Sequence, residues 1–98
     1  MMATYVMMSR WTDKGVEAVK DSPARVDAFK KAAAALGGEV REVFLALGRY
    51  DTLALMSAPD DETMAKISLS LCALGNVHTE TVRLFTESEF KKLVAGLR

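Results

Sequence analysis

Leu45-Ala-Leu-Gly-Arg-Tyr-Asp-Thr-Leu-Ala-Leu-Met56 sets two apolar runs on either side of a small polar island, Gly48-Arg-Tyr-Asp51. This pattern predicts two buried strands joined by a very tight turn. The apolar residues do not alternate with polar ones, so both faces of each strand must be covered. A chain of 98 residues has few elements with which to cover them. The stretch therefore bears on architecture and assembly, and not directly on chemistry.

The length and composition of the chain are those of a small globular protein. Its 98 residues suit a single domain, 1–98, with one modest core, and half of them are hydrophobic. Thirteen lysines and arginines balance 13 aspartates and glutamates. This neutral balance argues against bulk attraction to nucleic acid or to anionic membranes, so we expect neither as a partner.

The remaining composition predicts a cytoplasmic protein. The one cysteine, Cys72, cannot form an internal disulfide, so folding does not depend on an oxidising compartment. No run approaches the ~18 apolar residues of a membrane span. The N-terminus has no basic segment before its short apolar stretch, so we interpret it as a first strand and not as a signal peptide.

Caps and periodicity predict the other elements. Ser22-Pro23 suits a helix start and Gly37-Gly38 a helix end. A proline followed by carboxylates at 59–62 stops one strand and starts the next helix, and Thr86 to Glu89 fits a capping box. We predict strands over residues 4–10, about 40–47, 52–57 and about 77–85, helices over 22–36, about 60–74 and 87–97, and a short helical turn over 16–19.

This order, β-α-β-β-α-β with an additional C-terminal helix, predicts an α+β, ferredoxin-like fold. Right-handed crossovers place both main helices on one face of a four-stranded antiparallel sheet. Three of the strands carry apolar side chains on the other face as well, which would leave a patch larger than a monomer usually exposes. We therefore expect two chains to associate sheet on sheet, as a homodimer or a higher oligomer, in the manner of a dimeric α+β barrel.

Five segments carry a resemblance to a known family. They are Arg10-Trp-Thr-Asp-Lys-Gly15, Val19-Lys-Asp-Ser-Pro-Ala-Arg25, Gly48-Arg-Tyr-Asp51, Ala58-Pro-Asp-Asp61 and Gly75-Asn-Val-His-Thr-Glu-Thr81. In this order they resemble the GYD domain family of small, mostly bacterial and archaeal proteins, over roughly residues 4–97. The resemblance implies a ferredoxin-like domain of the dimeric α+β barrel superfamily. It implies no particular activity, because that superfamily includes cofactor-free monooxygenases, isomerases, haem-degrading enzymes and ligand-sensing domains.

The Gly48–Asp51 island permits two interpretations. In the structural one, Gly48 supplies the backbone freedom of the turn and Asp51 bonds to neighbouring backbone N–H groups. In the functional one, Tyr50 and Asp51 form a proton-handling or ligand-binding pair. We favour the structural interpretation, because so short a hairpin needs these residues for itself.

His78 is the only histidine, so a single chain holds no multi-histidine metal site. We expect it beside Arg10, Trp11 and Thr12, at the start of the last strand, either as an acid/base or haem-ligand candidate or as a partly exposed strand-end residue. At ~3.3 Å per residue we expect the Gly48–Asp51 turn roughly 20 Å away, at the opposite end of the sheet. The two would then form no common site within one chain.

Thr79, Thr81 and Arg83 share one face of the last strand, where they would bind a ligand or simply edge the sheet in water. Cys72 is predicted to be a buried, inert thiol. The sequence contains no phosphate-binding glycine loop, no CxxC pair and no serine-nucleophile elbow. It predicts no metal site and identifies no cofactor.

These observations lead to one main functional hypothesis and two alternatives. The main hypothesis is a homo-oligomeric protein that binds a small molecule between sheet and helices or at the dimer interface. The first alternative is a small cofactor-free enzyme, similar to a monooxygenase or isomerase, with His78 as acid/base and Arg10 or Arg83 polarising a carbonyl oxygen. The second is a purely structural subunit of an assembly, for which we would expect a dry, well-packed interior.

Overall fold

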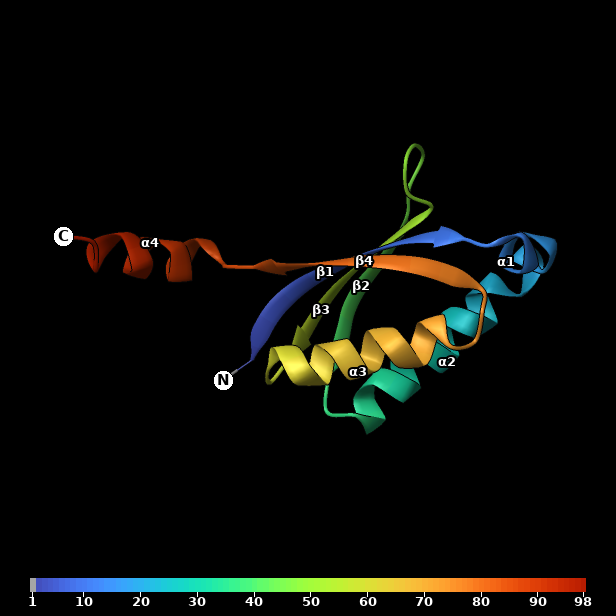
Figure 1. The fold of residues 1–98 in the computed structure, drawn as a ribbon, viewed down its shortest axis with the longest axis horizontal. Helices are drawn as coiled ribbons and strands as arrows, with labels where there is room; N and C mark the ends of the chain where they lie inside the picture. The colour runs from blue at the N-terminus through green and yellow to red at the C-terminus, as the bar shows by residue number, and fades with distance from the viewer. Residues whose placement is uncertain (1) are drawn as a thin grey trace.

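The structure, a computed structural model, describes residues 2–98. Four strands and four α-helices follow the predicted α+β order (Figure 1). The elements are β1 (Ala3–Trp11), α1 (Asp13–Glu17), the 3₁₀ turn η1 (Val19–Asp21), α2 (Ser22–Ala35), β2 (Glu39–Leu45), β3 (Thr52–Ala58), α3 (Asp61–Cys72), β4 (Val77–Leu84) and α4 (Glu87–Ala95).

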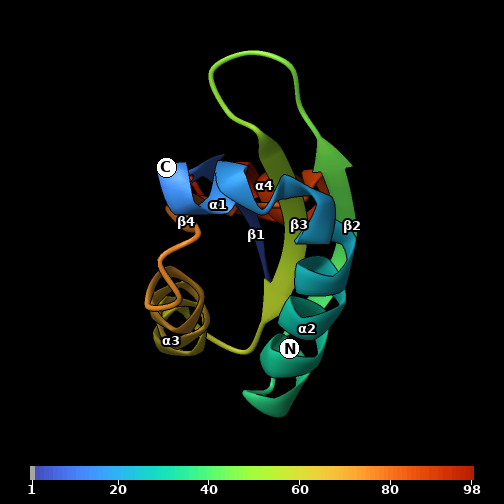
Figure 2. The ribbon, with the colours of Figure 1, turned by 90° about the vertical axis from the view of Figure 1, so that its right-hand side faces the viewer.

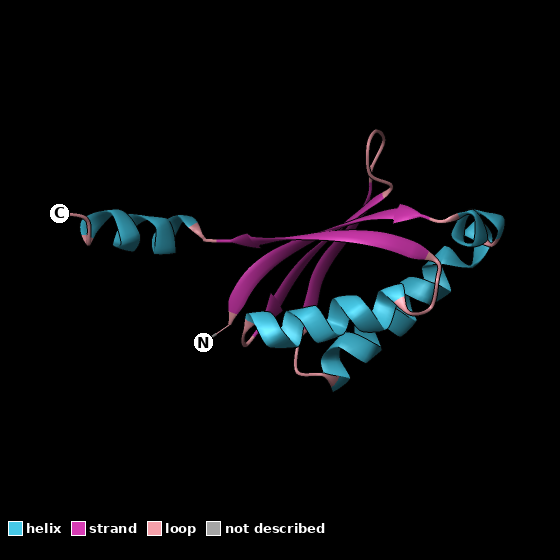
Figure 3. Ribbon diagram, in the orientation of Figure 1, coloured by secondary structure: helices cyan, strands magenta, loops and turns pink. Residues whose placement is uncertain are grey.

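The four strands form one antiparallel sheet in the order β2-β3-β1-β4. Its central strand β1 pairs with β3 on one side and with β4 on the other, so that Met7 lies between Ala54 and Thr81. Helices α2 and α3 both lie on one face of this sheet, as Figures 2 and 3 show. The predicted ferredoxin-like fold with an added C-terminal helix is confirmed.

The core lies between this face and the two helices. Its largest fully buried side chains are Met7, Met56 and Ile67. Tyr5 is also buried there, and its hydroxyl donates a 2.6 Å hydrogen bond to Asp61 Oδ1 at the start of α3. Burial, together with this hydrogen bond, raises the pKa of Tyr5 to about 12.

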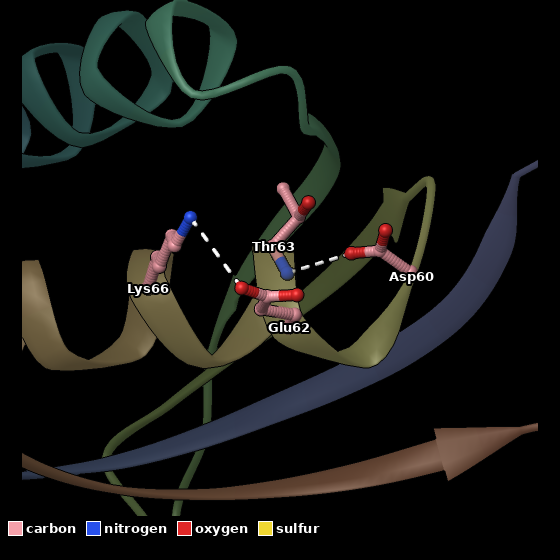
Figure 4. A network of polar contacts seen from close by, with 4 residues as sticks. All are labelled: Asp60, Glu62, Thr63 and Lys66. Carbon is pink, nitrogen blue, oxygen red and sulfur yellow. Dashed lines mark hydrogen bonds and ion pairs between the residues drawn. The ribbon is translucent and has the colours of Figure 1, made fainter.

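Local hydrogen bonds form two of the predicted helix starts. Helix α2 is different, because Ser22 is its first residue and not its cap, and the cap residue Asp21 makes no side-chain hydrogen bond there. In α3 the Asp60 carboxylate accepts a 2.8 Å bond from the backbone N–H of Thr63, and this bond lowers the pKa of Asp60 (Figure 4). The exposed Glu62–Lys66 pair in the next turn, at 3.8 Å, adds little. In α4 the predicted capping box of Thr86 and Glu89 is present.

The region around the opening stretch differs from its prediction in two respects. Strand β2 ends at Leu45 and not at Leu47, and a loop over residues 46–51 replaces the very tight turn. The backbone N–H of Ala46 closes this loop by donating to the carbonyl of Asp51 at 2.8 Å. Leu47, predicted to lie in a strand, is in this loop and 97% exposed.

Strand β2 is also not buried within its own chain. It is an edge strand, and Phe44 and Leu45 at its end are 49% and 71% exposed. A bulge between Val40 and Glu42 further interrupts its alternation. Apolar side chains at the end of β2 are therefore exposed to solvent, and no other part of the described chain covers them.

Replacing Gly15 by alanine should destabilise the fold by about 1–3 kcal/mol, because an added Cβ would lie 2.1 Å from the backbone oxygen of Asn76. Helix α1 cannot retreat from this contact, since the Thr12 hydroxyl donates to the carbonyl of Gly75 at 2.6 Å. Urea unfolding followed by circular dichroism measures the change. The control is Gly96→Ala, whose Cβ would meet its nearest neighbour at 3.5 Å and should change stability by less than about 0.5 kcal/mol. Equal effects of the two substitutions would contradict the close packing at Gly15.

Candidate functional site

Three strands and a loop meet at one end of the sheet. Strands β3 and β4 both run antiparallel to β1, so each begins where β1 ends: Ser9 lies opposite both Thr52 and Thr79, and Arg10 lies opposite His78. The loop over residues 46–51 precedes β3 directly, so it reaches the same end. It projects to the side of the sheet away from α2 and α3 (Figures 1 and 2).

Asp51 fastens this loop to β1. Its backbone N–H donates to the carbonyl of Ser9 at 2.8 Å, and its carboxylate accepts a 2.9 Å bond from the backbone N–H of Trp11. Gly48 takes a φ of +143°, a conformation that side-chain-bearing residues rarely adopt. Both residues therefore stabilise the loop. The sequence predicted that Asp51 would bond to N–H groups beside it in the turn, whereas the N–H group that its carboxylate accepts belongs to Trp11 on β1.

The predicted separation of His78 from this loop is wrong. The two border one small pocket of about 70 Å³, here called the polar pocket. The loop lies at the same end of β1 as His78, because an antiparallel neighbour of β1 must start beside the last residues of β1. The residues that border the polar pocket are Arg10, Arg49, Tyr50, His78, Thr79 and Glu80.

Tyr50 is held in the polar pocket by Glu80. Its hydroxyl donates to the Glu80 carboxylate, and this hydrogen bond raises the pKa of Tyr50. The guanidinium of Arg49 lies 5.8 Å from the centre of the Tyr50 ring. The hydrogen-bond partner of Tyr50 is thus Glu80 and not Asp51.

Glu80 was not among the predicted site residues, although the alternation of strand side chains points to it. Side chains in a strand alternate between faces, so residues 78 and 80 share a face of β4. The same alternation sends Thr79 and Thr81 to the helix side, where Thr79 Oγ1 lies 3.2 Å from Cys72 Sγ and Thr81 Oγ1 lies 3.2 Å from Ser68 Oγ. Cys72 itself is half-buried.

A larger cavity, here called the helix-face cavity, lies between the sheet and helices α2 and α3. Its volume is about 320 Å³ and its walls are mostly apolar. Trp11, one of the predicted ligand-binding residues, lines it. Its polar side chains are Ser9, Trp11, Ser22, Arg25, Thr52, Ser70 and Asn76.

Two of the predicted ligand-binding residues have structural partners instead. Thr12 caps α1 by accepting a 3.1 Å bond from the backbone N–H of Gly15. Arg83 stacks its guanidinium 4.4 Å from the Phe85 ring centre and 5.6 Å from that of Tyr5. Arg83 borders neither the polar pocket nor the helix-face cavity.

Within residues 2–98, no three histidine, cysteine, aspartate or glutamate side chains are grouped so that they could hold a metal ion. None of the helices in the same residues combines the length and apolar character that crossing a membrane requires.

Replacing Glu80 by alanine should lower the pKa of Tyr50 toward its ordinary value of 10.0, because the substitution removes the carboxylate that accepts the hydroxyl proton. A ¹³C NMR titration of the two tyrosines measures this pKa, with Tyr50→Phe identifying the signal. Glu42→Ala removes a carboxylate on the edge strand β2 and should leave the titration unchanged. Equal Tyr50 pKa values in the wild type and Glu80→Ala would mean that the hydrogen bond does not form in solution.

Two comparisons with solved structures support the fold. The crystal structure of TTHA0845 from Thermus thermophilus is similar with a TM-score of 0.56 and 28% identity, over 85% of this chain and 92% of that one. The crystal structure of MtbAldR is similar with a TM-score of 0.69 over 89% of this chain and 55% of that one, so this chain spans about half of its length. At 11% identity, the second likeness shows the fold alone.

The sequence comparisons define the family. A Thermus thermophilus protein named "Glutamine synthetase and cystathionine beta-lyase binding protein" is 30% identical over 98 residues, which are 99% of this chain and 100% of that protein. The family described as GYD domain matches residues 5–94, nearly all of the chain. The chain therefore belongs to the GYD domain family.

Proposed function

We propose that this protein is a single-domain, homo-oligomeric binding protein that acts through contacts with other chains and with a small molecule. The observation that carries the proposal is the sheet face that no helix covers, here called the open face. Along it, Met8 lies between Leu53 and Glu80, and Val6 lies between Leu55 and Val82. Its apolar members are Val6, Met8, Phe44, Leu53, Leu55 and Val82.

This face resembles an interface more than an ordinary surface. Phe44 and Val82, on the two edge strands, are 49% and 39% exposed. Contiguous apolar patches of this kind on soluble chains are usually sites of protein association. The polar pocket opens on the same side of the sheet, so a second copy seated on the open face would lie beside it.

Helix α4 offers a second apolar surface. It extends away from the sheet and the other helices (Figure 1). Phe90, Leu93, Val94 and Leu97 follow helical spacing on or just beyond it, and all four are at least 50% exposed. A helix of nine residues is marginal in water without tertiary contacts, and its own chain supplies few. A neighbouring copy is the partner that we propose for α4.

The mass in solution tests the self-association. The wild type should have a multiple of the 10.7 kDa chain mass at micromolar concentration, measured by light scattering. Phe44→Lys combined with Val82→Lys should reduce the mass to that of one chain, because the charges would be buried in the interface. Both side chains are exposed in the single chain, so the fold should tolerate the change. Leu69→Lys, at a 71% exposed position on α3, is the matched control and should keep the wild-type mass. A wild-type mass of 10.7 kDa would contradict the proposal.

We also propose that the assembled protein binds other proteins. Support comes from the relative named as a binding protein for glutamine synthetase and cystathionine beta-lyase, which matches along its whole length. The single cysteine fits a cytoplasmic location for such contacts.

Titration calorimetry with purified glutamine synthetase and purified cystathionine beta-lyase of the same organism tests this part. We expect saturable binding of at least one of them, and none of an unrelated oligomeric enzyme used as the control. Absence of binding to both enzymes would remove the support that the relative's name gives to protein partners.

The other two hypotheses receive less support from the geometry. For an enzyme, His78, Arg10 and Tyr50 do converge, but the polar pocket of about 70 Å³ is small beside the ~300–1,000 Å³ of typical ligand sites. A purely structural subunit predicts a dry, filled interior, whereas the helix-face cavity measures about 320 Å³. Small-molecule binding in that cavity is therefore part of the function that we propose.

A further inference from the structure

The helix-face cavity is large for a chain of this size. Its volume of about 320 Å³ lies within the range of small-molecule sites, at the lower end. The cavity is partly open to solvent, and its mostly apolar walls would favour an apolar or amphipathic occupant. Its apolar lining includes Met7, Val26, Phe29, Ala33, Val43 and Leu71.

The lining contains polar groups contributed by several elements. Ser9 and Trp11 come from the last residues of β1, Thr52 from the first residue of β3, and Asn76 from the residue just before β4. The register places Ser9 directly opposite Thr52, at the sheet end where the three strands meet. An amphipathic molecule would fit this distribution, with its polar group at that end and its apolar part along α2 and α3.

Among the described residues, Arg25 is the only lysine or arginine that lines the helix-face cavity. It is half-buried, and its guanidinium donates to the carbonyls of Ala18 and Gly15, each at 3.1 Å, and to the Ser22 hydroxyl at 3.2 Å. All three acceptors are neutral. In residues 2–98 the ion pairs are Lys66–Glu62 and Lys91–Glu87, so no carboxylate of this part of the chain neutralises Arg25.

The remaining donors of Arg25 suit an anion. A guanidinium has five N–H donors, and the three hydrogen bonds to neutral oxygens use one hydrogen of Nη1 and both hydrogens of Nη2. The Nε–H and the second Nη1–H remain, and no carboxylate of the described residues lies within ion-pair distance of the charge. The three bonds also hold the side chain in place, so little conformational entropy remains to be lost on binding. The two remaining donors lie on different sides of the guanidinium, so a carboxylate would accept a single hydrogen bond from Arg25, and the positive charge favours a carboxylate over a neutral head group.

We propose that the helix-face cavity binds a small carboxylic acid with an apolar body, and that Arg25 binds its carboxylate. The apolar body would contact the α2 and α3 side of the cavity, and the hydroxyls of Ser9 and Thr52 are further donors on the sheet side. This assignment rests on the small-molecule part of the proposed function, and it adds the chemical class of the ligand and the residue that selects it.

Trp11 is the only tryptophan and it lines the helix-face cavity, so its fluorescence reports occupancy directly. The probes are octanoate and its uncharged counterpart octanamide, titrated into the wild-type protein. We expect a saturable change with octanoate and at least tenfold weaker binding of octanamide. Arg25→Gln should reduce octanoate binding to the level of octanamide. Arg83→Gln, which alters an arginine outside the cavity, is the matched control and should leave binding unchanged.

The outcomes distinguish a failure of the carboxylate assignment from a failure of the proposed function. Equal binding of octanoate and octanamide by the wild type would overturn the carboxylate assignment and leave small-molecule binding standing. Absence of binding for both probes would overturn the assignment as well, while the mass measurement independently decides self-association. Because the two probes are compared on the unaltered protein, the test holds even if Arg25→Gln loosens the segment between α1 and α2.

Discussion

The antiparallel pairing of β1 with both of its neighbours is the constraint on which the rest of the structure depends. It fixes where β3 and β4 begin, and both begin beside the last residues of β1. The 46–51 loop, the start of β4 and the α1 segment are consequently brought to one end of the sheet. The polar pocket lies there on the open face, and polar groups of the helix-face cavity lie there on the other face. The backbone pairing of β1 with β3 and β4 therefore positions both the polar pocket and the polar end of the helix-face cavity.

The second governing feature is that the chain covers only one face of an apolar sheet. Helices α2 and α3 cover Met7 and Met56 on one side of the sheet, with Ile67 of α3 buried against them, but no helix covers the side chains on the other face of these strands (Figure 2). Helix α4 points away from the sheet that it could have covered (Figure 1). Hydrophobic burial within one chain is therefore incomplete, which is why association is central to the proposed function.

The residues of the Gly48–Asp51 island have different structural roles. Gly48 gives the loop its backbone path, and Asp51 ties it to β1 through two hydrogen bonds. Tyr50 is thereby held over β4, where its hydroxyl donates to the Glu80 carboxylate and its pKa is raised. The island is thus a structural feature that places one aromatic hydroxyl beside His78, in a pocket that a partner chain on the open face would border.

The type and order of the elements could be predicted from the sequence, because these depend on neighbouring residues: the Thr86–Glu89 capping box is present, and α2 begins at Ser22-Pro23. The non-alternating run before the loop was predicted less well, since β2 is an exposed edge strand that ends at Leu45. Of the candidate residues that the sequence offered, Arg10, Tyr50 and His78 border the polar pocket and Trp11 borders the helix-face cavity. His78 and Tyr50 are close because β3 and β4 both run antiparallel to β1. Which of these residues border the same pocket therefore depends on the tertiary structure. The same holds for Arg25, whose role rests on a cavity between two helices and a sheet. Contacts between residues distant in sequence follow from register and packing, which local patterns do not encode.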